Sequence, residues 1–167
     1  FSESDIEGLC SVGNGNKSKN SKKVGYKGIG FKAVFIQSSL VYVQSGQTCC
    51  FKFDKEACFN LLPENLKAEL KRDNVPLYDD VPWQIIPIGS NPPVKLDAEG
   101  FNVIIYIKMS RLAELLPKIE KLLKDKEFLL FLNAEQVSVS LFDNKRLITS
   151  ISRVKKGDVV ELAMNGT

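Results

Sequence analysis

Three glycines within six residues, directly ahead of a short apolar stretch, constrain this chain more than any other feature. Residues 25–35 read GYKGIGFKAVF. Glycine tolerates positive φ and lets the backbone approach a ligand closely. Phe31, Val34 and Phe35 have the apolar spacing of a helix, whose unpaired N–H groups would point back into the turn. The segment therefore predicts a phosphate-facing turn that runs into a helix.

Positive charge is concentrated just before and within this turn. The whole chain carries 23 basic and 20 acidic residues, a net charge of only +3. Residues 13–32 nevertheless contain no acid and six lysines, which are Lys17, Lys19, Lys22, Lys23, Lys27 and Lys32. Residues 13–23 also lack any apolar side chain, so we expect this loop to be ordered only by a ligand.

Two other phosphate-binding patterns fit less well. Residues 28–33 satisfy the GxGxxA dinucleotide pattern, but that pattern requires a buried strand before it, and the preceding residues are polar and rich in lysine. Residues 13–18 faintly resemble a Walker loop, yet Asn16 stands where a glycine must precede the lysine. The dinucleotide site stays as a disfavoured alternative, and the Walker loop is rejected.

The remaining pattern predicts an α+β fold. We expect a two-layer sandwich in which helices cover one face of a mixed, mostly antiparallel sheet, with residues 1–167 forming a single domain. Predicted helices cover residues 5–10, 31–35, 63–71 and 110–124, and Ser2 or Ser4 caps the first of them. Predicted strands cover residues 40–43, 49–53, 83–88, 101–107, 137–142, 147–152 and 159–164.

Cysteine and histidine usage limits the chemistry. The four cysteines (Cys10, Cys49, Cys50 and Cys58) show no CxxC spacing, and histidine is absent, so no zinc set, other metal ligand or catalytic residue is assigned. We expect free thiols in a reducing compartment. No apolar run approaches the length of a membrane span and no signal peptide opens the chain, so we expect a soluble intracellular protein, cytoplasmic or nuclear, with no membrane partner.

The glycine segment resembles one found in the GHKL ATPases, the superfamily of gyrase, the large heat-shock chaperones and the histidine kinases. The likeness is greatest to its sacsin and NO VEIN branch. Residues 9–19 (LCSVGNGNKSK) are similar to the stretch that opens the ATP lid of that branch. Residues 101–106 (FNVIIY) resemble the strand on which the family often places a threonine near the adenine, and Asn102 holds that place here. Residues 129–132 (LLFL) are also similar to this branch.

This resemblance implies a partial Bergerat-type fold that binds ATP with Mg²⁺ under a mobile lid of about residues 13–24. The turn would hold the β- and γ-phosphates, and Phe31 would pack the following helix onto the sheet. The residues that the resemblance assigns to ATP are Gly13, Lys17, Ser18, Lys19, Gly25, Lys27, Gly28, Ile29, Gly30, Phe31, Lys32 and Asn102.

The catalytic side of the family site has no counterpart among these residues. The family carries a glutamate as general base, an asparagine as magnesium ligand and an Asp-x-Gly motif that reads the adenine. We expect these to lie upstream, in a longer parent of which this chain, beginning with Phe1, is a piece. ATP hydrolysis is accordingly expected of the intact parent. The implied function is a nucleotide-driven conformational switch, whose partners are ATP or ADP and other domains or a second subunit.

Two alternatives from other classes remain. The domain could be degenerate and serve as a protein-interaction scaffold without nucleotide. It could also bind nucleic acid through its lysine-rich loop, which is less favoured because the loop lacks the interleaved aromatic side chains of single-strand binders. Trp83, beside two prolines, is expected to be a packing anchor.

Overall fold

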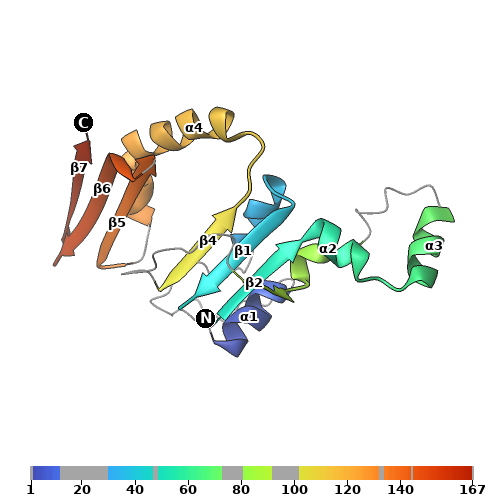
Figure 1. The fold of residues 1–167 in the computed structure, drawn as a ribbon. Helices are drawn as coiled ribbons and strands as arrows, with labels where there is room; N and C mark the ends of the chain where they lie inside the picture. The colour runs from blue at the N-terminus through green and yellow to red at the C-terminus, as the bar shows by residue number, and fades with distance from the viewer. Residues whose placement is uncertain are drawn as a thin grey trace. The chain divides into compact units, whose positions relative to one another are not determined.

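Two units, each containing one antiparallel sheet, make up the described part of the chain. The computed structural model describes residues 2–11, 30–46, 49–72, 81–91, 102–131, 134–143 and 145–166. The boundary between the units lies between Ser110 and Arg111. The predicted α+β class is confirmed, but the strands belong to two sheets where we expected one (Figure 1). That residues 1–167 act as a single domain stays a prediction.

The first unit contains a four-stranded sheet with strand order β3-β2-β1-β4. The predicted strands at residues 40–43 and 49–53 are confirmed as β1 (Leu40–Ser45) and β2 (Cys49–Asp54), which form an antiparallel hairpin with Gly46 at a φ of 59° where β1 ends. β4 (Val103–Ile107) pairs with the other edge of β1, and β3 (Ile88–Gly89) pairs with β2. Every pair is antiparallel.

Five short helical segments accompany this sheet. They are α1 (Glu3–Cys10), the 3₁₀ helix η1 (Phe31–Ile36), α2 (Lys55–Asn60), α3 (Glu64–Arg72) and the 3₁₀ turn η2 (Trp83–Ile85). Ser2 caps α1 as predicted, since its hydroxyl accepts from the Asp5 N–H while the Asp5 carboxylate accepts from the Ser2 N–H.

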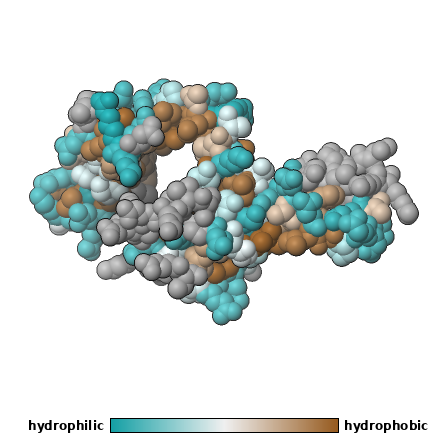
Figure 2. Space-filling model, viewed as in Figure 1, coloured by the Kyte–Doolittle hydropathy of each residue, from teal (hydrophilic) through white to brown (hydrophobic). Residues whose placement is uncertain are grey.

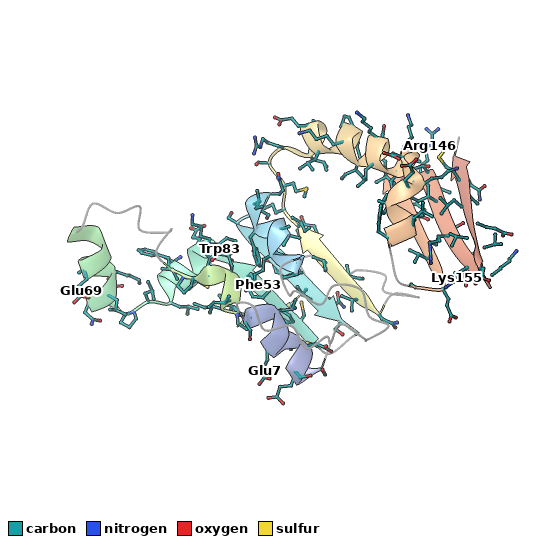
Figure 3. All side chains as sticks on the ribbon, turned by 180° about the vertical axis from the view of Figure 1, so that it is seen from behind. Glu7, Phe53, Glu69, Trp83, Arg146 and Lys155 are labelled. Atoms are coloured by element: carbon teal, nitrogen blue, oxygen red, sulfur yellow. The ribbon has the colours of Figure 1, made fainter. Side chains whose placement is uncertain are left out.

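An aromatic cluster packs η1 and η2 onto one face of the sheet. Phe53 of β2 is fully buried, and its ring centroid lies 5.8 Å from Phe31, 5.3 Å from Phe35 and 5.7 Å from Phe51. Trp83 of η2 joins the cluster through Phe35, at 5.0 Å (Figure 3). Residues of α1 and α2 pack against the same core. Trp83 is therefore a packing anchor, as predicted.

The predicted strand at residues 83–88 is wrong. The chain forms η2 there, because the Ile85 N–H donates to the Pro82 carbonyl and the Ile86 N–H donates to Trp83 in the i to i+3 pattern of a 3₁₀ turn. Proline has no N–H and a fixed φ, so Pro82 starts a turn readily, and Pro87 has no donor for a sheet ladder. Extended pairing is confined to β3, which follows Pro87.

The second unit contains a three-stranded meander with strand order β5-β6-β7. β5 (Gln136–Asp143), β6 (Arg146–Lys156) and β7 (Val159–Gly166) confirm the three predicted strands. Two helical segments precede them, α4 (Leu112–Lys124) and the 3₁₀ helix η3 (Lys126–Phe131). Leu123, Leu129 and Ile151 form the buried core of this unit.

The helix α4 departs from an ideal amphipathic helix in two ways. Pro117 lies inside it and has no N–H to donate to the preceding turn. Apolar side chains also stay at its surface, where brown atoms follow the helix in Figure 2, and Leu112 and Leu122 are both more than half exposed. Neither α4 nor any other helix in the described ranges is long and apolar enough to cross a membrane.

Arg153 of β6 is a buried cation in the core of the second unit. It is 6% exposed and lies opposite Val137 and Leu162 on the neighbouring strands. Its guanidinium donates to the Ala134 carbonyl, while its Nε has no hydrogen-bond partner. Charged groups lose much solvation free energy on burial. Burying Arg153 therefore offsets part of the stabilisation that the apolar residues around it provide.

In the first unit, the Asp54 carboxylate both forms an ion pair and caps a helix. Its carboxylate accepts from the Ala57 N–H at 2.9 Å, capping α2, and from Lys52 Nζ at 2.6 Å. Burial by itself would raise the pKa of Asp54, but the hydrogen bonds from Lys52 and Ala57 hold it below its ordinary value of 3.8.

We predict that Leu129→Ala destabilises the protein by about 2–5 kcal/mol, because the fully buried Leu129 side chain would leave a cavity. Leu130→Ala is the matched control. Leu130 is 49% exposed, and its truncation should change the free energy of unfolding by less than about 1 kcal/mol. Urea unfolding followed by far-UV circular dichroism measures both, and equal effects would contradict the assignment of Leu129 to the core.

We predict that Asp54→Asn lowers stability by about 1 kcal/mol at pH 7, because it removes the Lys52 ion pair while keeping a good capping side chain. The folded pKa of Asp54 is depressed, so this contribution is present above pH 3.8 and disappears as the pH falls through the lower folded pKa. Urea unfolding of both proteins between pH 7 and pH 2 measures the difference, which should shrink below pH 3.8. A difference that grows with acid would refute the assignment.

Candidate functional site

Four of the predicted ATP-binding residues lie within the described ranges: Gly30, Phe31, Lys32 and Asn102. The other eight lie outside them, and these are Gly13, Lys17, Ser18, Lys19, Gly25, Lys27, Gly28 and Ile29. The geometry of the site is accordingly that of η1 and the elements packed around it.

Gly30 precedes η1 in an ordinary helical conformation. Its φ is −60° and its ψ is −44°, so this glycine does not use the positive φ that its lack of a side chain permits. Among the described residues, a Cβ added here would meet nothing within 4 Å. Neither the backbone conformation nor packing against the described residues requires glycine at position 30.

The 3₁₀ geometry of η1 packs Phe31 onto the sheet and places Lys32 on the same face as Phe35. Phe31 contacts Phe53, which confirms that it packs this segment onto the sheet. The predicted helix at residues 31–35 is a 3₁₀ helix, in which the Ala33 N–H donates to Gly30 and the Gln37 N–H to Val34. At three residues per turn, Lys32 lies directly above Phe35.

The ammonium of Lys32 is buried and has no counter-charge among the described residues. Its Nζ is inaccessible to solvent, and within the described ranges it has no hydrogen-bond partner and forms no ion pair. Its electrostatic neighbour is Cys10 of α1. Burial raises the pKa of the Cys10 thiol above 9.0, and the charge of Lys32 offsets this only in part. Cys10 is therefore neutral near pH 7 and does not compensate Lys32.

Lys32 also lines a pocket between η1 and η2. The pocket has a volume of about 410 Å³ and is lined by Lys32, Phe35, Ile36, Pro82, Gln84 and Ile85. Sequence reasoning missed the wall formed by η2, because residues 83–88 were predicted as a strand. The prolines on both sides of that segment were the signal that could have indicated a turn.

Asn102 is not brought together with Lys32. Its carbonyl accepts from the Gly46 N–H, which places it where β1 ends and β4 begins. η1 packs instead against Phe53, which pairs with Val41 near the start of β1. A six-residue strand spans about 17 Å, so the two residues lie toward opposite ends of the sheet. A role for Asn102 near the adenine stays a prediction.

The four cysteines are free thiols, as predicted, and all of them lie within the described ranges. Burial raises the pKa values of Cys50 and Cys58 as well as that of Cys10. Low-pKa thiolates are the reactive ones, so these three thiols have a structural character. The described residues contain no cluster of three or more metal-ligating side chains.

Comparison with protein-family models, with curated proteins and with solved structures finds no match for this chain.

We predict that Lys32→Met raises the free energy of unfolding of the ligand-free protein by about 1–3 kcal/mol, because methionine replaces a buried ammonium that lacks a partner with an apolar group of similar length. Lys118→Met, at an exposed position on α4, is the control and should change stability by less than about 0.5 kcal/mol. Thermal and urea unfolding measure both. Destabilisation by Lys32→Met would show that the ammonium is compensated.

Proposed function

We propose that this chain binds ATP beside η1, as the phosphate side of a Bergerat-type nucleotide-binding domain that works as a conformational switch. The observation that carries the proposal is the buried ammonium of Lys32, two residues beyond Gly30, which no described residue compensates. A buried cation is unfavourable unless an anion pairs with it, and a phosphate oxygen is a strong acceptor for ammonium.

Gly30 supports the same conclusion from the main chain. Because no described residue lies within 4 Å of the position its Cβ would take, a phosphate could approach the backbone there. η1 is a six-residue 3₁₀ helix, so its dipole adds little, and most of the local positive charge comes from lysine. The resemblance of residues 25–35 to the GHKL ATPases favours ATP among phosphate ligands.

The proposal concerns binding and the conformational response to it. ATP, with Mg²⁺, would order the lid predicted at about residues 13–24, and that ordering would be relayed to other domains or a second subunit. Hydrolysis is a property proposed only for the parent protein, which would supply the general base and the magnesium ligand.

We predict that Gly30→Ala weakens ATP binding about tenfold, or about 1.4 kcal/mol, because the added methyl group obstructs the approach of phosphate to the backbone. Gly89→Ala is a matched control, since a Cβ at Gly89 also meets nothing within 4 Å and lies in β3. Isothermal titration calorimetry with ATP and Mg²⁺ measures both affinities, with circular dichroism to confirm folding.

Equal affinities of the two variants would contradict the role of Gly30. Failure of the folded wild-type chain to bind ATP at all would contradict the proposal and favour the alternative in which the domain is a protein-interaction scaffold.

A further inference from the structure

A serine side chain is inserted into the last rung of the β1–β4 ladder. Leu40 and Lys108 continue the register of Val41 and Ile107, and facing antiparallel residues at such a rung exchange two backbone hydrogen bonds. One of them is present, from the Lys108 N–H to the Leu40 carbonyl at 3.3 Å. The Leu40 N–H donates instead to Ser38 Oγ at 3.1 Å, and Ser38 Oγ donates to the Lys108 carbonyl at 2.7 Å. The hydroxyl therefore takes the place of the second backbone bond.

The Lys108 carbonyl depends on this hydroxyl more than the Leu40 carbonyl does. Ser38 Oγ lies 2.7 Å from both carbonyl oxygens, but a hydroxyl has a single proton to donate. The Leu40 carbonyl also accepts from the Lys108 N–H. Because Ser38 is only 7% exposed, removing its hydroxyl would leave polar backbone groups of this rung without that partner in a place with little access to water.

Ser38 connects two elements that lie far apart in the sequence. The Gln37 N–H donates to the Val34 carbonyl, so Ser38 directly follows the last hydrogen bond of η1. On the other side, Lys108 follows β4, which lies beside β1 (Figure 1). The two residues after Lys108 lead to the boundary between the units. Ser38 thus stands between the element that carries Lys32 and the segment through which the chain leaves the first unit.

We propose that Ser38 is a positioning residue that couples the conformation of η1 to the last rung of the β1–β4 ladder. A ligand that orders η1 stabilises this rung through the Ser38 hydroxyl, and the residues that lead to the second unit are held with it. Segments that open together share one opening free energy, so stabilising one of them protects the other. As regulation of the nucleotide site this inference rests on the proposed function, but the coupling itself belongs to the ligand-free chain.

Amide hydrogen exchange of the ligand-free chain, resolved by residue with NMR, measures the coupling. The two reporters are the Gln37 N–H, which ends η1, and the Lys108 N–H in the last rung. The Gly46 N–H donates to Asn102 at the other end of β4, so its exchange is the reference for unfolding of the whole sheet. Each reporter rate is divided by the Gly46 rate.

Three variants separate coupling from a local effect. Ser38→Ala removes the hydroxyl, whereas Ser38→Thr retains it. Ser90→Ala is the matched control, because the Ser90 hydroxyl donates to the carbonyl of its neighbour Asn91. We expect Ser38→Ala to speed exchange at both reporters about tenfold, while the other two variants stay within about threefold of wild type. Faster exchange at Lys108 alone, or no recovery in folded Ser38→Thr, would overturn the proposal.

Lys32→Met supplies a perturbation at η1 without any ligand. Because it removes a buried charge from η1, it should slow Lys108 exchange about threefold relative to Gly46. In the Ser38→Ala background the same replacement should leave the Lys108 rate unchanged. Absence of slowing in the wild-type background, or slowing that persists without the hydroxyl, would overturn the coupling.

ATP with Mg²⁺ separates this inference from the proposed function. If the chain binds ATP beside η1, the nucleotide should slow Lys108 exchange in the wild type and leave it unchanged in Ser38→Ala. Failure to bind ATP, with the effect of Lys32→Met on Lys108 still dependent on the hydroxyl, would contradict the proposed function and support the coupling. ATP binding that slows Lys108 exchange equally in both proteins would contradict the coupling alone.

Discussion

The burial of Phe53 among other rings is the interaction on which the first unit depends. Phe53 lies on β2, one of the two middle strands of the sheet, and its ring contacts Phe31 and Phe35 of η1. Aromatic pairs at 5–6 Å in tilted or edge-to-face geometry add to the free energy of burial itself. Because Phe35 also contacts Trp83, the same cluster orients both helical segments that line the pocket. The packing of Phe31 and Phe35 against Phe53 therefore fixes the position of Lys32, which lies between them in the sequence.

Lys32 and Arg153 illustrate two outcomes for a cation that leaves water. Arg153 sits in the core of the second unit, where a backbone carbonyl satisfies part of its guanidinium. Lys32 lines a pocket, and its buried Nζ has no partner among the described residues. The position of Arg153 is closed by protein on both neighbouring strands, so its role is structural. No described residue compensates Lys32, which is why the proposed function rests on it.

The alternating and helical patterns predicted most elements because local spacing decides which face of a strand or helix is apolar. The hairpin of β1 and β2 and the meander of the second unit are examples. Alternation does not identify a strand's partner, so the division into two sheets could not be predicted. Alternation also missed the pocket wall at η2, where Pro82 and Pro87 were the signal for a turn. Lys32 was predicted as an ATP-binding residue from the motif around it, but its burial results from tertiary contacts that the motif does not show. The helical φ of Gly30 shows that a glycine's identity alone does not reveal its conformation.

The strand orders of the two sheets have a consequence for how each unit forms. In the second unit every pairing joins strands adjacent in the chain, so short loops close the whole sheet. In the first unit β1 pairs with β4, which follows it only after α2, α3, η2 and β3. Closing a long loop costs more conformational entropy and slows folding. The β1–β2 hairpin can therefore form early, while the other edge of β1 stays unpaired until β4 docks against it. During that interval the edge of β1 is open to pairing with another chain, which makes β4 a protective strand as well as a structural one.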